Sequence, residues 1–173
     1  MKGLVILATV LGGAGLPGAA AAKDSNPPDV RLYDLGGALV DTARIRAAGD
    51  AKLLALDFFS VDCPSCKAQL PAWSEAHARM AAAGLRIALV AVPLGDDRDA
   101  ALDRTRRYFR EHPVPFPVLW DKYAVAAKAY GVADGTSARL PQAFLIDRDG
   151  RQVAHSDGHE GTLDEAARLL APK

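Results

Sequence analysis

The chain has 173 residues, of which 50% are apolar and 24% are charged, a composition typical of one globular domain with its own core. Its 21 basic and 21 acidic residues cancel to a formal net charge of zero. Because there is no basic excess, the sequence favours neither a nucleic-acid-binding protein nor one that adheres to anionic lipid.

The first residues have the features of a targeting segment. Lys2 is followed by an apolar stretch over residues 4–16 and by small residues over 19–22. We therefore predict a signal peptide over residues 1–22, cleaved before Lys23, and an exported protein located in the periplasm or an equivalent extracytoplasmic space. The apolar stretch is shorter than the roughly 20 residues that a membrane span needs, although an uncleaved N-terminal membrane anchor is the competing interpretation.

The elements after this segment can be taken in chain order. Residues 23–29 predict a flexible leader, and residues 30–173 predict a single domain. The domain begins with a short strand over 30–35, while residues 40–48 fit a strand end followed by a helical turn. Residues 53–59 (L-L-A-L-D-F-F) form a continuous apolar run with one acid in it, typical of a central strand buried on both faces of a parallel sheet.

A helix is predicted over residues 64–83, since Pro64 suits the first helical position and Gly84 is a natural stop. Pro71 should kink this helix, because proline lacks the backbone N–H that the helix requires. Residues 86–92 then predict a second buried strand.

The second half alternates in the same way. It predicts a helix over 99–111, a short strand over 118–120, a helix over 122–130, a loop over 132–140, and a strand–turn–strand over 142–146 and 152–155. The sequence T-L-D-E at 162–165 matches a capping box, which predicts that the last helix starts there and runs to residue 170. Parallel strand–helix–strand units followed by an antiparallel hairpin predict an α/β fold, a three-layer sandwich with one mixed sheet and helices on both faces.

The two cysteines, Cys63 and Cys66, form a C-x-x-C pair between the predicted central strand and the following helix. In an oxidising compartment such a pair readily forms a disulfide. A disulfide that closes so short a loop restricts the unfolded chain little, so it indicates a redox function rather than a structural one. The helix start offers free N–H groups that stabilise a Cys63 thiolate, the attacking species in disulfide exchange, and Cys66 lies one turn further in, where it can resolve a mixed disulfide.

Asp57 is the only ionisable residue in the predicted central strand. Burial disfavours a charged carboxylate and so raises its pKa, which suits it to accept the proton of Cys66. The alternative is that Asp57 merely ends the buried part of the strand.

The segment from Leu56 to Pro71 (L-D-F-F-S-V-D-C-P-S-C-K-A-Q-L-P) resembles the active-site region of thioredoxins. The matching positions are Asp57, Cys63, Cys66, Lys67 and Pro71. Over residues 30–170, with R-L-Y-D-L-G-G, F-P-V-L-W-D, A-Y-G-V and L-P-Q-A-F-L-I-D-R-D-G, the chain is similar to the TlpA-like branch of exported thioredoxin-fold proteins. The resemblance implies a thioredoxin-like fold and a cis-proline at Pro141 beside the cysteines.

The same resemblance implies a thiol–disulfide oxidoreductase that needs no cofactor and no metal. Its partners would be the thiols and disulfides of exported proteins, it would act as a reductant, with cytochrome c maturation as one setting, and a membrane protein would supply its electrons. Three features depart from the family pattern. Asp62 replaces the usual tryptophan before the first cysteine, Pro64-Ser65 is an unusual pair between the cysteines, and the acid that some members carry after the next strand has Asp96 as its match.

Three other functions remain as alternatives. A metal carrier, for copper or zinc, would use Cys63 and Cys66 with His155 and His159, although these histidines fall at a predicted strand end rather than on one helix face. A thiol peroxidase of related fold would carry threonine where this chain has Ser60. A binding module with an idle disulfide is the third, and Trp73 and Trp120 fit core positions better than partner contacts.

Overall fold

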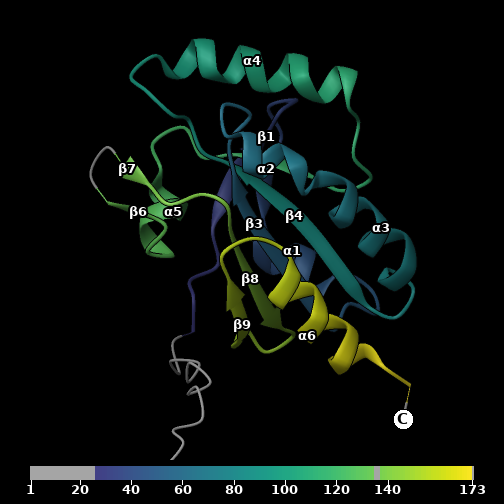
Figure 1. Cartoon of the computed structure of the whole chain (residues 1–173). Helices are drawn as coiled ribbons and strands as arrows, with labels where there is room; N and C mark the ends of the chain where they lie inside the picture. Colours follow the sequence, from purple (N-terminus) through teal and green to yellow (C-terminus); the bar gives the residue numbers. More distant parts are fainter. Residues whose placement is uncertain (1–25, 135–136, 173) are drawn as a thin grey trace, which may run out of the picture.

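A mixed β-sheet forms the centre of the computed structural model, which describes residues 26–134 and 137–172 (Figure 1). In these residues the main sheet has seven strands in the order β2-β1-β5-β4-β3-β8-β9. They are β1 (Arg31–Asp34), β2 (Leu39–Asp41), β3 (Leu53–Phe59), β4 (Leu85–Ala91), β5 (Val118–Trp120), β8 (Gln142–Asp147) and β9 (Gln152–Ser156). The helices are α1 (Thr42–Ala47), α2 (Pro64–Ala68), α3 (Leu70–Met80), α4 (Arg98–Glu111), α5 (Val125–Ala129) and α6 (Glu160–Leu170).

The three middle strands β3, β4 and β5 are parallel, and β1, β8 and β9 extend the sheet with antiparallel pairing. Every residue of β3 is buried, because both faces of this strand are covered. The continuous apolar sequences of β3 and β4 follow from that position, since a strand covered on both faces has no solvent side for polar residues.

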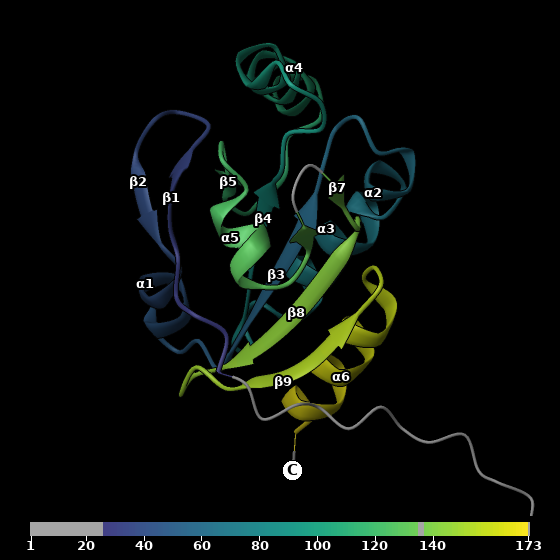
Figure 2. The ribbon, with the colours of Figure 1, turned by 90° about the vertical axis from the view of Figure 1, so that its left-hand side faces the viewer.

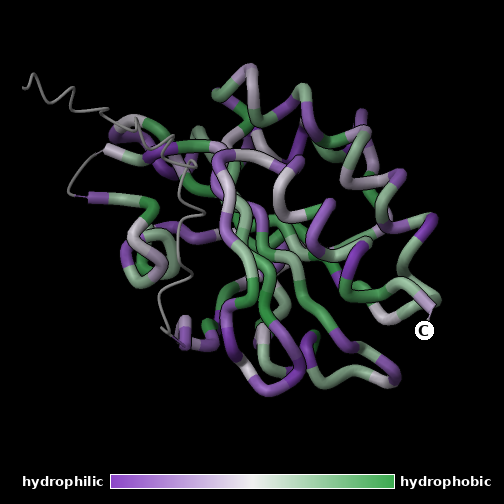
Figure 3. The backbone as a smooth tube through the Cα atoms, turned by 60° about the horizontal axis from the view of Figure 1, so that its bottom comes forward, coloured by the Kyte–Doolittle hydropathy of each residue, from purple (hydrophilic) through white to green (hydrophobic). Residues whose placement is uncertain are grey.

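Two apolar layers lie on opposite faces of the sheet, and side chains alternate between them along β3. Leu53, Ala55 and Phe59 belong to the layer that includes Cys66 of α2, Trp73 of α3 and Ala166 of α6. Leu54, Leu56 and Phe58 belong to the other layer, against α5 and α1. Figure 2 shows the sheet between these two groups of helices, and Figure 3 shows the hydrophobic colouring concentrated on the central strands. The predicted three-layer α/β sandwich is therefore confirmed.

The expected strands over 53–59 and 118–120 are confirmed to the residue, as β3 and β5. The helix expected over 64–83 is interrupted as predicted, and the break lies at Gln69, two residues before Pro71. Pro71 cannot donate to the carbonyl four residues earlier, so α2 ends, and α3 begins with Pro71 in its first turn, where no donor is needed.

Two expectations about the second half were wrong. The segment expected as a loop over 132–140 includes a small two-stranded sheet, formed by β6 (Ala133–Asp134) and β7 (Ser137–Ala138). The last helix begins at Glu160 rather than at the expected capping box, and its N-cap residue, His159, makes no side-chain cap.

Thr162 is fully buried and bonds outside its helix, which explains why the capping-box interpretation failed. Its hydroxyl donates to the carbonyl of Ala143 in β8 at 3.2 Å and lies 2.7 Å from the hydroxyl of Ser156. Its backbone N–H donates to the same Ser156 hydroxyl. The residue therefore fastens α6 to the sheet instead of capping it.

The predicted signal peptide, residues 1–22, lies outside the described residues. The described end of the predicted leader contacts the domain, because Tyr130 donates to the Pro28 carbonyl and Asp29 pairs with Arg46. In the described part of the chain, no helix has the length and apolar character that a bilayer span requires.

Thr162→Val should lower the free energy of unfolding by about 1–3 kcal/mol, because it leaves the buried Ala143 carbonyl without its hydroxyl donor. Urea denaturation measures this. Glu165→Ala is the matched control, since it removes the residue that a capping box would need. It also removes the ion pair of Glu165 with the exposed Arg168, and such a pair contributes about 0.5 kcal/mol or less. Equal losses in the two variants would contradict the role given to Thr162.

Candidate active site

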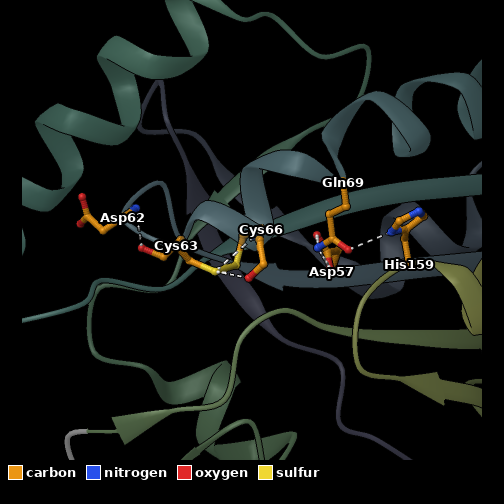
Figure 4. The surroundings of a disulfide bond; sticks show 8 residues. Asp57, Asp62, Cys63, Cys66, Gln69 and His159 are labelled. Carbon is orange, nitrogen blue, oxygen red and sulfur yellow. Dashed lines mark hydrogen bonds between the residues drawn. A yellow bond between two sulfur atoms is a disulfide. The ribbon is translucent and has the colours of Figure 1, made fainter.

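The predicted redox cysteines lie where β3 ends and α2 begins (Figure 4). After Phe59 the chain turns through residues 60–62, and Cys63 becomes the N-cap residue of α2. Pro64 takes the first helical position, as its missing N–H allows. The predicted strand-to-helix setting of the pair is thus the observed one.

Cys63 and Cys66 are joined by a disulfide, with their Cα atoms 5.3 Å apart. Cys63 is partly exposed, whereas Cys66 has no exposed surface. The Cys63 Sγ atom accepts the backbone N–H of Cys66 at 3.2 Å and lies 3.2 Å from the Ser65 hydroxyl. Because α2 has only five residues, these direct contacts, rather than the dipole of a long helix, are what can stabilise a thiolate on Cys63.

Asp57 is fully buried in the middle of β3. By strand alternation it lies on the face of Cys66 and Trp73, and its partners in the neighbouring strands are the apolar residues Leu89 and Ala143. Burial raises the pKa of Asp57 well above its usual value, while the nearby Trp73 and Gln69 side chains act in the opposite direction. The interpretation of Asp57 as merely the end of the buried strand does not fit, since Phe58 and Phe59 after it are equally buried.

The contact of Gln69 and His159 with the Asp57 site was not predicted from the sequence, in which His159 was considered only as a metal ligand. Gln69 is buried, and its Nε2 atom donates to both carboxyl oxygens of Asp57 at 3.2 Å. Its Oε1 atom lies 3.2 Å from Nδ1 of His159, at the start of α6. Trp73 Nε1 also favours the charged form of Asp57 from nearby but has no hydrogen bond within the described residues, so Gln69 is the hydrogen-bond donor to Asp57. Figure 4 shows Gln69 between Asp57 and His159.

Asp62, the predicted accessory residue before Cys63, forms a two-pronged ion pair with Arg104 of α4, with distances of 3.0 and 2.7 Å. The carboxylate raises the pKa of Arg104. Lys67 of α2 lies over the ring of Tyr108 in α4, 5.8 Å from its centroid, which adds a contact between the two helices. Arg104 therefore offsets the negative charge of Asp62, the residue before Cys63, which is the predicted nucleophile.

The other two predicted residues lie in different settings. The Leu140–Pro141 bond is cis, and Pro141 leads into β8. Asp96 is exposed in the loop after β4, and within the described residues its side chain takes part in no hydrogen bond or ion pair. The neighbouring Asp97 is the residue with a clear role, since it caps α4 by accepting the Ala100 N–H at 2.9 Å. The structure thus places Asp57 within β3 and the cysteine pair at the junction of β3 and α2, and among the described residues it shows no contact between them and the Asp96 side chain.

The histidines considered for a metal carrier are engaged separately. His159 contacts Gln69, and His155 lies 2.6 Å from the Gln142 amide oxygen and stacks on Phe144. Among residues 26–134 and 137–172, no group of three or more histidine, cysteine, aspartate or glutamate residues is placed to hold a metal ion.

The comparisons with known proteins now decide the family. The model of the AhpC/TSA family matches residues 24–155. The chain belongs to this family. It is 26% identical over 153 residues to the thiol-disulfide oxidoreductase ResA of Bacillus subtilis, covering 87% of this chain and 77% of the relative. It is 25% identical over 147 residues to ResA of Bacillus thuringiensis, covering 84% and 76%.

Solved structures agree on the fold. A putative thiol:disulfide interchange protein DsbE from Chlorobium tepidum superposes with a TM-score of 0.69 at 22% identity, covering 86% of this chain and 96% of that one. The peroxidoxin BcpB of Mycobacterium tuberculosis superposes with a TM-score of 0.70 at 14% identity, covering 86% and 97%. Together with the C-x-x-C pair, these results confirm the expected family: the chain is a thioredoxin-fold thiol–disulfide oxidoreductase.

Asp57→Asn should change how stability depends on pH. Since folding raises the pKa of Asp57, the native protein is favoured below the usual aspartate pKa, and this contribution is lost as pH rises towards the raised value. The uncharged variant lacks that loss, so its free energy of unfolding should fall less between pH 4 and pH 8 than that of the wild type. Urea denaturation of the oxidised protein measures both profiles.

Asp96→Asn is the matched control, because it removes an exposed acid that has no hydrogen bond or ion pair among the described residues, and it should change the profile less than Asp57→Asn does. An Asp57→Asn profile parallel to that of the wild type would show that the buried carboxyl does not titrate as described.

Arg104→Met should reduce the fraction of Cys63 present as thiolate at neutral pH, because the charge of Asp62 is then uncompensated. The pH at which reduced Cys63 is half alkylated by iodoacetamide should rise by about a few tenths of a unit at low salt, and by less at high salt, as expected for an exposed pair. The double variant Asp62→Asn/Arg104→Met should return towards the wild type. No shift at low salt in Arg104→Met would refute the compensation.

Proposed function

We propose that the mature protein is an exported reductant of protein disulfides. The observation that carries the proposal is the contrast between the two sulfurs. Cys63 is partly exposed and its Sγ accepts a backbone N–H, whereas Cys66 is fully buried. This is the arrangement that an attacking thiolate and a resolving thiol require.

The proposed reaction has two steps. The Cys63 thiolate attacks a partner disulfide, forms a mixed disulfide and releases one partner thiolate, which takes a proton from solvent. Cys66 then transfers its proton to Asp57 and attacks Sγ of Cys63, which forms the Cys63–Cys66 disulfide and releases the second partner thiolate. Two electrons pass from the protein to its partner, and a dithiol donor must reverse both steps.

The family resemblance leads us to propose that the backbone beside Pro141, at the start of β8, is where a partner chain can pair. Export is supported by the N-terminal targeting pattern of the sequence and by the likeness to a secreted Mycobacterium tuberculosis disulfide oxidoreductase. A membrane protein as electron donor and apocytochrome c as substrate complete the proposal, and both derive from the family resemblance.

Replacing each cysteine in turn tests the mechanism. Cys63→Ser should lower the rate of insulin disulfide reduction to the uncatalysed level, because the attacking thiolate is gone. Cys66→Ser should retain the first attack and accumulate a mixed disulfide, visible on non-reducing gels. Full activity in Cys63→Ser would refute the mechanism, and hydrogen peroxide consumed faster than insulin is reduced would favour a peroxidase instead.

The equilibrium reduction potential of the pair tests the direction. A reductant should have a potential of about −270 mV or lower, as in thioredoxin. A reduction potential of about −120 mV would indicate an oxidant that donates its disulfide, and the proposed reducing role would then be wrong.

A further inference from the structure

Three side chains from distant parts of the sequence connect the buried acid to the protein surface. Both oxygens of Asp57 accept from Nε2 of Gln69 at 3.2 Å, and Oε1 of Gln69 lies 3.2 Å from Nδ1 of His159. An amide oxygen can only accept, so the His159 Nδ1 atom must carry the hydrogen of that bond. His159 is half-buried, and its ring meets the buried Trp73 ring edge-on at 6.3 Å.

The orientation of the Gln69 amide decides whether the Asp57 carboxylate faces a hydrogen-bond donor or an oxygen. In the observed orientation the amide presents its donor to Asp57, whereas a flipped amide would present its oxygen to a negative charge. The hydrogen bond from His159 holds the oxygen away from Asp57 and so favours the observed orientation. Gly158, with a φ of +98°, brings the chain close here, since a Cβ atom at that position would lie 3.4 Å from Oε1 of Gln69.

Few other charges act on this set. In the sheet, Asp57 is flanked by Leu89 and Ala143, and the helices covering it contribute the cysteine pair, Gln69 and Trp73. At the surface end, Glu160 follows His159 in α6, and Asp157 precedes it but is bonded to Gln142. Among the described residues, the Gln69 amide is therefore the side chain that donates hydrogen bonds to the Asp57 carboxyl.

We propose that Gln69 and His159 are positioning residues that hold the Asp57 carboxylate ionised and oriented to accept the proton of Cys66. The inference rests on the proposed role of Asp57 in the second step of disulfide exchange. His159 acts through Gln69, by fixing which end of the amide faces the acid. Neither residue exchanges a proton with the cysteines.

The test separates the two steps with the aromatic disulfide 5,5′-dithiobis(2-nitrobenzoate). Attack by Cys63 on the reduced full-length protein releases a first thionitrobenzoate, and attack by Cys66 on the mixed disulfide releases a second. Gln69→Leu removes the donor to a buried carboxylate, so the second release should slow about tenfold near neutral pH, and its pH midpoint should rise by about one unit. The first release should not change.

Two substitutions at His159 decide the matter, because this half-buried position tolerates change better than Gln69. His159→Ala should slow the second release about threefold and shift its midpoint in the same direction, since only the amide orientation is lost. His159→Asn should restore the wild-type profile, because the asparagine amide N–H can occupy the place of Nδ1. His155→Ala is the matched control, since its glutamine partner contacts the exposed Asp157 instead of a buried acid, and it should behave as the wild type.

An unchanged pH midpoint in His159→Ala overturns the inference, and so does a His159→Asn variant that is as slow as His159→Ala. Asp57→Asn distinguishes this failure from failure of the proposed function. If Asp57→Asn abolishes the pH dependence while His159→Ala leaves it intact, only the positioning role is wrong. If Asp57→Asn leaves the second release unchanged, the proton step itself is wrong.

Discussion

A carboxyl group inside a β-sheet must find hydrogen-bond donors, because an isolated charge in an apolar interior is strongly disfavoured. Asp57 lies between Leu89 and Ala143, so the sheet offers it no polar side chain. Its donor must come from the helical layer above, at the junction where α2 gives way to α3 and Gln69 is buried. Gln69 reaches this carboxyl from the helix break before Pro71. The chain before α6 approaches the other side of the same glutamine at Gly158.

Near the surface of the same site, interactions between charges are weaker than in the interior. Asp62 and Arg104 form their ion pair near solvent, where the attraction between charges is weak and screened by salt. Its importance is therefore local: it offsets the negative charge of the residue that precedes Cys63, the cysteine that we propose attacks as a thiolate. Together with the Lys67–Tyr108 contact, it also links α4 to α2 and to the turn before it, so that the segment between β4 and β5 packs beside the cysteine pair.

The sequence was most informative where one local rule dominates. The apolar runs predicted β3 and β5 to the residue, because a strand that is buried on both faces is apolar along its whole length. The prolines predicted where the helix after β3 starts and that it is interrupted. The sequence was misleading at Thr162. Its T-x-x-E pattern matched a capping box, but its hydroxyl donates a hydrogen bond to the carbonyl of Ala143, 19 residues away. The short β6–β7 pair was missed because two-residue strands leave no periodic pattern to read.

The proposed role of Gln69 and His159 could not be predicted from the sequence, because it depends on the burial of Asp57 and on contacts between distant segments. The protein contains a second Asp–Gln–His set, in which Gln142 donates to Asp157 at 2.6 Å and lies 2.6 Å from His155. The residue types and the hydrogen-bonding order are the same, but Asp157 is exposed and solvated. Solvent can stabilise that carboxylate whether or not the glutamine is oriented, whereas burial separates the Asp57 carboxyl from bulk solvent. The same three residue types therefore form a hydrogen-bonded contact at the surface around Asp157, whereas around Asp57 we propose that they determine whether the carboxyl is ionised.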